Sequence, residues 1–274
     1  MRVYLGKQGA TGRSSKVADQ NRIASSTALR VFGVLECVAG SRKPMTVASV
    51  CEATGLDRAT AYRALVTLHD AGYVQRDETG KSYSLGFKIV SMARSLLADD
   101  SDTLRVRDVL RSLAEETGET CHYSVLDGRQ TVITMREKGT QLVSVDFRVG
   151  DRGYLHATSI GKVLLAHQLA EFIDGVLDQP LVALTPNTIT NPAVLRRELQ
   201  TIRAAGRGID DCEMVDGMRC VAAPIFEAGG SVRSGISTSG PAARYTDDWL
   251  NYLGGKLVEY TTRLSAKSRT AELR

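Results

Sequence analysis

Residues 46–77, TVASVCEATGLDRATAYRALVTLHDAGYVQRD, decide the fold of the first part of the chain. The pattern predicts a short helix from Thr46 to the turn at Gly55, then a longer helix that Asp57 caps and Gly72 ends. The apolar face of the longer helix consists of Ala61, Leu65 and Leu68. Two short alternating segments, YVQRD and KSYSL, then flank the turn ETGK, as in a β-hairpin. Helix, glycine-containing turn, helix and hairpin in this order are typical of a winged helix-turn-helix.

A further helix is expected just before this stretch. Its N-cap is Ser25 or Ser26, and Gly40 ends it. The apolar residues that recur at helical spacing are Ala28, Leu29, Phe32, Leu35, Val38 and Ala39. This helix completes a three-helix core, so we expect the winged helix-turn-helix domain to span residues 22–86.

Candidate DNA-contacting residues lie in the N-terminal half of the longer helix, at the start of the short helix and on the hairpin. They are Thr46, Arg58, Thr60, Tyr62, Arg63, Arg76 and Lys81. A recognition helix docks its N-terminal half into the major groove, where Arg donates two hydrogen bonds to guanine and Thr meets a base edge or a phosphate. Other roles stay open. Tyr62 could pack against the hairpin, Arg63 could pair with a nearby Asp, and Arg76 and Lys81 could be solvated charges.

Charge is unevenly distributed along the chain. Through Ser84 there are 12 Lys and Arg against 7 Asp and Glu, a net charge of +5, whereas the remainder carries 23 against 24, a net charge of −1. Residues 1–21 are rich in Gly, Ser, Lys and Arg without apolar periodicity, which predicts a flexible basic arm. A basic first module favours a polyanion such as double-stranded DNA as its partner, although a solvated basic surface would look the same.

The second part of the chain is expected to form an α+β domain with a largely antiparallel sheet, over residues 101–268. A helical repeat predicts a linker helix at 87–100 before it, and residues 269–274 form a tail. The segments expected as strands are 120–127, 131–137, 142–149, 220–226 and 232–239. The segments expected as helices are 104–117, 157–168, 194–206 and 246–265.

Composition excludes several classes of protein. The chain has 274 residues and 43% hydrophobic content, enough for two ordinary domains. Its five cysteines are scattered, without the spacing of a disulfide framework or a zinc site. There is no apolar run near the ~20 residues of a membrane span, and the N-terminus lacks the apolar core of a signal peptide. We therefore expect a cytoplasmic protein without a membrane segment, a metal or a cofactor.

Six motifs occur in order over about residues 23–265: SSTALRVFGVLE, LDRATAYRALVTLHDAGYVQRD, YSLGFKIVSMA, LHATSIGKVLLA, GIDDCEMVDGMRCVAAPIF and ISTSGPAAR. In these motifs the chain resembles the IclR family of bacterial transcription regulators. The resemblance implies a linker helix and a GAF- or profilin-like domain that binds a small effector, an organic acid or an aromatic acid. It also implies dimers or dimers of dimers on palindromic operators. The family contains repressors and activators, and we favour a repressor.

The effector site is expected around HATSIGKVLLA, residues 156–166. The start of this helix leaves the N–H groups of Ser159 and Ile160 free for an anion, although an ordinary N-cap would look the same. Ser237 and Ser239 are two residues apart on a strand, so both hydroxyls face one side, either to hold a carboxylate or as surface decoration. The resemblance adds Leu142, Val145, Asp210 and Cys220 as pocket residues. It also suggests that Gly153 enlarges the cavity.

Residues 210–226, DDCEMVDGMRCVAAPIF, raise a rival possibility: a Cys-dependent enzyme in which Cys220 pairs with His122, His156 or His167. A reactive Cys needs an electropositive, partly exposed setting, whereas CVAAPIF begins a buried apolar strand. The eight-residue gap between Cys212 and Cys220 does not fit a zinc site. We therefore predict no catalytic residue and no metal ligand, and assign this stretch to the wall of a pocket.

Overall fold

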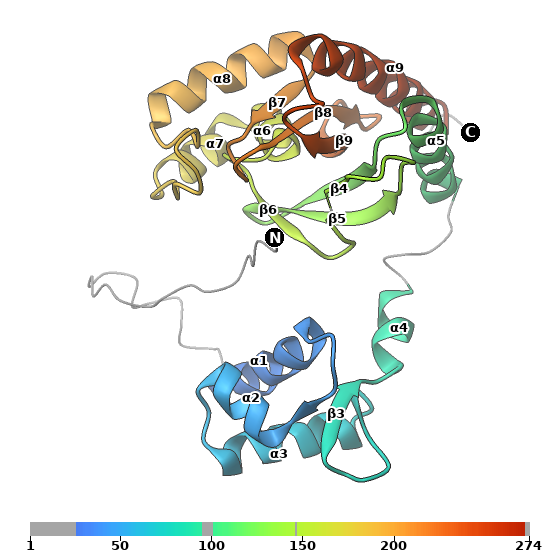
Figure 1. Cartoon of the computed structure of the whole chain (residues 1–274). Coiled ribbons are helices and arrows are strands. Elements are labelled where there is room, and N and C mark those ends of the chain that lie inside the picture. Colours follow the sequence, from blue (N-terminus) through green and yellow to red (C-terminus); the bar gives the residue numbers. More distant parts are fainter. Residues whose placement is uncertain (1–25, 95–100, 146, 272–274) are drawn as a thin grey trace. The chain divides into compact units, whose positions relative to one another are not determined.

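The computed structural model describes residues 26–94, 101–145 and 147–271, which form two compact units that are treated separately (Figure 1). The predicted basic arm at residues 1–21, the end of the predicted linker helix and the last residues of the predicted tail lie outside the described residues. Among those described, no helix is both long and apolar enough to cross a bilayer.

The first unit is a three-helix core with a small sheet. Its helices are α1 (Ser26–Gly40), α2 (Val47–Thr54) and α3 (Arg58–Asp70). The Thr46 hydroxyl caps α2 by accepting the Ser49 N–H, and the Asp57 carboxylate caps α3 by accepting the Thr60 N–H. Gly55 ends α2 in the left-handed conformation, with φ of 72°, which glycine adopts without strain. Both predicted helix starts are therefore confirmed.

The wing is a sheet in the order β1-β3-β2, one strand more than the predicted hairpin. Its strands are β1 (Met45–Thr46), β2 (Val74–Arg76) and β3 (Ser82–Leu85). The predicted apolar face of α3 is confirmed, since Ala61, Leu65 and Leu68 are all buried. The prediction for α1 was partly confirmed: Val38 is buried and Leu35 packs against the core. Leu29 and Phe32 are exposed, and Val34, which the prediction omitted, is buried one turn before Val38.

The described part of the predicted linker is a single short helix, α4 (Lys88–Ala93). It buries none of its residues within its own unit, and Phe87, Val90 and Met92 are exposed. Lys88 fixes its start by donating to the Ala71 carbonyl and lying over the Tyr73 ring.

The second unit is a six-stranded antiparallel sheet in the order β6-β5-β4-β9-β8-β7, with helices on both faces (Figure 1). The strands are β4 (Cys121–Asp127), β5 (Gln130–Glu137), β6 (Arg152–Tyr154), β7 (Gly208–Asp211), β8 (Met218–Phe226) and β9 (Val232–Pro241). The helices are α5 (Ser101–Thr117), α6 (Ser159–Ala166), α7 (Ala170–Leu177), α8 (Pro192–Ala205) and α9 (Asp247–Ala271). The expected α+β class is confirmed.

Successive side chains along the central strands point to opposite faces of the sheet, and each face packs against its own set of helices. Val221, Ala223 and Ile236 pack with α5 and α9 in one core, while Ala222 packs with α6, α7 and α8 in the other. On β8 and β9, positions two residues apart share a face, so Cys220, Ser237 and Ser239 lie on the α6 side. This side of the sheet carries the pocket described below.

The strand predicted at 142–149 was wrong. The described residues of this segment have no strand pairing, and only the short β6 that follows joins the edge of the sheet. Val143 and Val149 are exposed, and the Val143 carbonyl accepts a hydrogen bond from Arg244 instead of a strand neighbour. The apolar residues of this segment therefore do not belong to a strand. Individual side chains make their own contacts, as Phe147 does at the pocket.

Candidate functional site

Helix α3 presents a polar, basic surface at its N-terminal half. Arg58, Tyr62 and Arg63 are exposed, and Thr60 is half-buried. The hydrogen bonds from Thr60, with the Arg63 charge in support, hold the pKa of Asp57 below its usual range. Tyr62 is 45% exposed and is not packed into the core with the wing, so its ring is available to a partner.

Two of the predicted DNA contacts already have structural roles. The Thr46 hydroxyl is occupied in capping α2. The Arg76 guanidinium donates to the Gly80 carbonyl at 2.7 Å and lies 5.5 Å from the centre of the Tyr83 ring, which fixes it to the wing. Lys81 is exposed at the wing turn, and its backbone N–H is held by Asp77. The strongest candidates for base contact are therefore the exposed arginines of α3.

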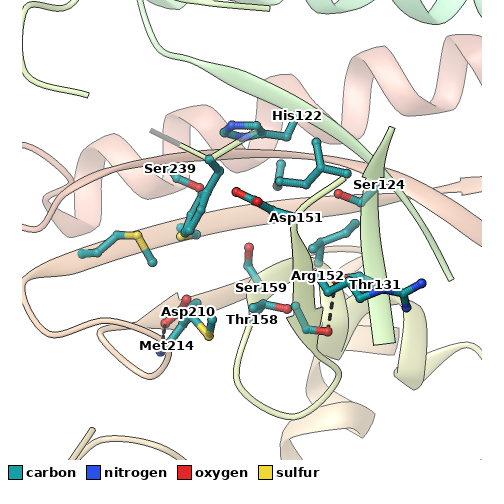
Figure 2. Close-up of a pocket in the computed structure, with 17 residues that line it drawn as sticks. His122, Ser124, Thr131, Asp151, Arg152, Thr158, Ser159, Asp210, Met214 and Ser239 are labelled. Atoms are coloured by element: carbon teal, nitrogen blue, oxygen red, sulfur yellow. Dashed lines mark hydrogen bonds between the residues drawn. The ribbon is translucent and has the colours of Figure 1, made fainter. Parts of the chain in front are cut away.

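The second unit contains a pocket on the α6 side of the sheet, with a volume of about 480 Å³ including its open mouth (Figure 2). Its walls come from β4, β5, β6, β7, β8, β9, the start of α6 and the segments before β6 and β8. The lining residues are His122, Ser124, Thr131, Ile133, Phe147, Asp151, Arg152, Gly153, Thr158, Ser159, Ile160, Asp210, Met214, Met218, Cys220, Ser237 and Ser239. Its lining combines apolar side chains with a few polar ones, as in pockets that bind small molecules.

Strand register brings several of these polar side chains into rows. Asp210 pairs with Cys220, which pairs with Ser239, so these three side chains stand in one line across β7, β8 and β9. The next row along β9 places Ser237 opposite His122 of β4. Neighbours across antiparallel strands have Cβ atoms about 5 Å apart, so both rows form a continuous polar floor.

The start of α6 closes this floor with free N–H groups. The Thr158 hydroxyl accepts the Gly161 N–H at 3.0 Å and donates to the Tyr154 carbonyl at 2.9 Å. The helix start leaves the N–H groups of Ser159 and Ile160 without an intrahelical partner, inside the positive end of the helix dipole. We call these two N–H groups and the hydroxyls of Ser237 and Ser239 the carboxylate seat.

Asp210 lies at the β7 end of the floor and is fully buried. Its Oδ1 accepts the N–H groups of Glu213 and Met214, whereas its Oδ2 has no hydrogen-bond partner among the described residues. Burial raises the pKa of this carboxyl to about 7, and the Glu213 charge adds to the effect. Near neutral pH the group is therefore partly protonated and able to donate.

His122 lies on β4, at the other end of the floor. The ring is 1% exposed, meets Phe147 edge to face, and neither nitrogen has a hydrogen-bond partner among the described residues. Burial, with the Arg136 charge, lowers its pKa to about 4, so the imidazole is neutral. The Ser124 hydroxyl, two residues along the same face, is also buried without a partner in the described chain.

A buried ion pair supports the loop behind Asp210. The Lys162 ammonium of α6 bonds Glu213 at 2.5 Å and Glu198 of α8 at 3.1 Å, and Lys162 is 1% exposed. Burial raises the pKa of Glu213 while Lys162 opposes that rise. Thr185 and Thr188 bind backbone carbonyls of the same loop, which fixes its path from β7 to β8.

Catalysis by Cys220 is disfavoured. Burial and the nearby Asp210 charge raise the pKa of its thiol well above the usual value, which suppresses the thiolate. The His156 ring donates to the Val182 carbonyl and the His167 ring donates to the Val163 carbonyl, so both rings are engaged elsewhere. All five cysteines are free, and no cluster of metal-binding side chains occurs among the described residues.

Six of the eight predicted effector residues line the pocket: Ser159, Ile160, Asp210, Cys220, Ser237 and Ser239. Leu142 is fully exposed and lies outside it, and Val145 packs behind it against Met214, Met218 and Cys220. Gly153 does line the pocket, where an added Cβ would lie 2.7 Å from the Thr131 hydroxyl. Sequence reasoning missed His122 and Ser124 as pocket residues, although two polar residues on one face of an apolar strand were a visible signal.

A winged helix-turn-helix unit with exposed arginines on α3, followed by a separate unit with a polar pocket, defines the chain as a DNA-binding transcription regulator. Residues 27–78 match the IclR helix-turn-helix domain, and residues 103–266 match the bacterial transcriptional regulator IclR C-terminal family. The chain belongs to the IclR family. It is a regulator, and its relatives are named as regulators and not as enzymes.

Individual relatives agree along nearly the whole chain. The HTH-type transcriptional regulator BhcR of Paracoccus denitrificans is 31% identical over 267 residues, which cover 97% of this chain and 95% of that protein. The transcriptional repressor IclR of Escherichia coli is 30% identical over 233 residues, covering 84% and 85%. An IclR homologue from Microbacterium hydrocarbonoxydans, solved in complex with 4-hydroxybenzoate, has a TM-score of 0.73 at 26% identity and covers 89% of this chain and 100% of that one.

Proposed function

We propose that this regulator is a repressor whose affinity for a palindromic operator changes when a small organic acid, aliphatic or aromatic, binds the pocket. The observation that carries the proposal is the carboxylate seat, where free helix-start N–H groups and two strand hydroxyls converge on one cavity. Several relatives are named as repressors, which favours repression over activation. The 4-hydroxybenzoate complex of the Microbacterium homologue favours an acid as the ligand.

The seat binds an acid without a buried cation. Among the described lining residues, the only basic side chain besides His122 is Arg152, which is half-exposed and paired with Asp127 at 2.6 Å. The carboxylate would therefore rely on dipoles: the α6 start, the hydroxyls of Ser237 and Ser239, and protonated Asp210 as a further donor. One charge then enters the pocket, and no dicarboxylate is accommodated.

On the DNA side, we propose that Arg58 and Arg63 of α3 enter the major groove, with Thr60 and Tyr62 beside them. Lys81 and Arg76 of the wing contact phosphates. Thr46 contacts the DNA through its backbone at the start of α2. The protein works in the cytoplasm as a homodimer or a dimer of dimers, so that paired winged units match half-sites about one helical turn, ~34 Å, apart. An acid that favours one spacing of these units changes operator affinity by roughly 5- to 150-fold.

Binding and transcription assays test the proposal. The full-length protein is screened against small carboxylates by thermal unfolding, and those that stabilise it are added to a gel-retardation assay with the DNA upstream of its own gene. An acid at 100 times its dissociation constant stabilises the folded state by about 2.7 kcal/mol. If no acid stabilises the protein or alters DNA retardation, the effector part of the proposal fails while DNA binding stands. Lower reporter expression after deletion of the gene would indicate an activator.

A further inference from the structure

The pocket contains a polar end that the carboxylate seat does not use. His122 and Ser124 both lie on β4, whereas Asp210 lies on β7, three strands away in the order β4-β9-β8-β7. Three strand spacings amount to ~14 Å. Figure 2 shows His122 and Asp210 on opposite sides of the pocket, with Ser159 between them. Ser237 of the seat is the cross-strand neighbour of His122, so a ligand held at the seat has a second polar surface within reach.

Three buried polar atoms at this end of the pocket have no hydrogen-bond partner in the described part of the chain. Both His122 nitrogens and the Ser124 hydroxyl are buried and lack a partner among the described residues. A buried polar group without a partner is costly, so such groups in a pocket are expected to be satisfied by what binds there. Because burial keeps the imidazole neutral, one of its nitrogens carries a proton and the other a lone pair, and no described residue occupies either.

The unprotonated nitrogen of the neutral imidazole offers its lone pair to the ligand. A carboxylate or an ether oxygen has no proton to donate to it, but a hydroxyl donates to the imidazole nitrogen and accepts from Ser124 at the same time. We propose that the effector is a monocarboxylic acid bearing a hydroxyl group, and that His122, with Ser124 in support, is the residue that selects the hydroxyl. This inference rests on the proposed function, because it needs an acid at the seat.

The test uses sets of three acids that differ at one position: a parent acid, its hydroxy derivative and the corresponding methyl ether. Sets are built on C3 to C6 alkanoates and on benzoate, with each position substituted in turn. Dissociation constants are measured by calorimetry for wild type and for His122→Phe, which keeps the ring shape and removes the lone pair. The control is His167→Phe, because His167 is half-buried and does not line the pocket.

For at least one set, we expect wild type to bind the hydroxy acid roughly 10- to 100-fold more tightly than both its parent and its ether, the range for satisfying one buried hydrogen-bonding group. In His122→Phe this ratio falls to near 1, and in His167→Phe it persists. If His122→Phe does not fold, nitrogen NMR of the wild-type imidazoles replaces it: the unprotonated nitrogen of His122 shifts on adding the hydroxy acid but not the ether.

Two negative results are distinguishable. If acids bind but the hydroxyl gives no advantage, or the advantage survives in His122→Phe, this inference is overturned and the proposed function stands. If no acid of any set binds, the seat itself is refuted and the inference falls with it.

Discussion

Burial shifts the pKa values of two pocket residues in opposite directions: it raises that of Asp210 and lowers that of His122. Asp210 keeps its proton up to about pH 7, while His122 stays neutral down to about pH 4. In the unfolded chain the imidazole would be charged below about pH 6.5 and the carboxyl above about pH 3.9. Between pH 4 and 6.5 the folded protein thus binds the proton at Asp210 that the unfolded chain binds at His122, and the two pH dependences cancel.

Asp210→Asn separates the two effects. The raised pKa of Asp210 contributes stability at low pH that is lost as the pH rises towards 7, and Asn removes this loss while keeping the acceptor for Glu213 and Met214. The free energy of unfolding of the variant, minus that of wild type, should rise by about 1.4 kcal/mol per pH unit between pH 4 and 7. Urea unfolding at pH 5, 6 and 7 measures it. A difference independent of pH would show that Asp210 is ionised throughout.

His122→Gln should show the opposite dependence. The lowered pKa of His122 contributes stability above about pH 6.5 that is lost as the pH falls towards 4, so the variant should gain relative to wild type on acidification. The same urea series at pH 4.5 to 7 measures this gain. An equal effect of the substitution at every pH would mean that His122 has the same pKa in the folded and unfolded protein.

Arg58→Ala addresses base reading by α3. If Arg58 contacts a base, the variant should lose about 1 to 3 kcal/mol of binding free energy for the operator and little for random DNA. If Arg58 contacts a phosphate, the affinity for both DNAs should fall and the dependence of binding on salt should become shallower. Arg233→Ala, at an exposed position in β9, is the matched control. Unchanged operator affinity of Arg58→Ala at low and high salt would remove this residue from the interface.

Helix α6 and the β7–β8 loop depend on each other through Lys162. Replacing Lys162 with Met leaves Glu213 buried without its cation, which should destabilise the protein by about 3 to 5 kcal/mol near neutral pH. Adding Glu213→Gln should recover most of this loss, because the side chain at position 213 then carries no charge. Lys256→Met, which breaks a solvent-screened pair with Glu116, should destabilise the protein much less than Lys162→Met does. Equal losses in the two single variants would argue against a structural ion pair at α6.

Elements with strong local signals could be predicted from the sequence, and those set by tertiary pairing could not. The caps Thr46 and Asp57 identify the starts of α2 and α3 because a side chain binds a nearby N–H. The buried face of α1 depends on which row meets α3, and an apolar pattern that includes Leu29 and Phe32 cannot reveal that. Residues 142–149 alternate like a strand, yet no neighbour pairs with them among the described residues.

The pocket residues also fall into those that local sequence predicts and those that depend on tertiary pairing. Ser237 and Ser239 were predictable from their spacing, and Ser159 from the helix start that follows Thr158. Leu142 was placed in the pocket by resemblance, but it lies in an irregular segment where strand alternation does not hold. His122 joins the pocket only because β4 pairs with β9, and that pairing joins residues more than a hundred positions apart.

The two units divide the work of the molecule. The first presents exposed arginines and the second a polar pocket, and the family to which the chain belongs combines both in single regulators. An effector at the pocket can alter DNA binding only by its different affinity for the DNA-bound and free forms of the protein. A substitution at the seat should therefore change the response to the acid and spare the DNA-contacting surface.

The most direct test measures operator affinity with and without an acid that stabilises the protein, in wild type and in Ser237→Ala/Ser239→Ala. We expect the acid to change wild-type operator affinity at least 5-fold and to have little effect on the double variant at the same concentration. Both proteins should bind the operator similarly without acid. An equal response of the two proteins to the acid would contradict the assignment of the seat.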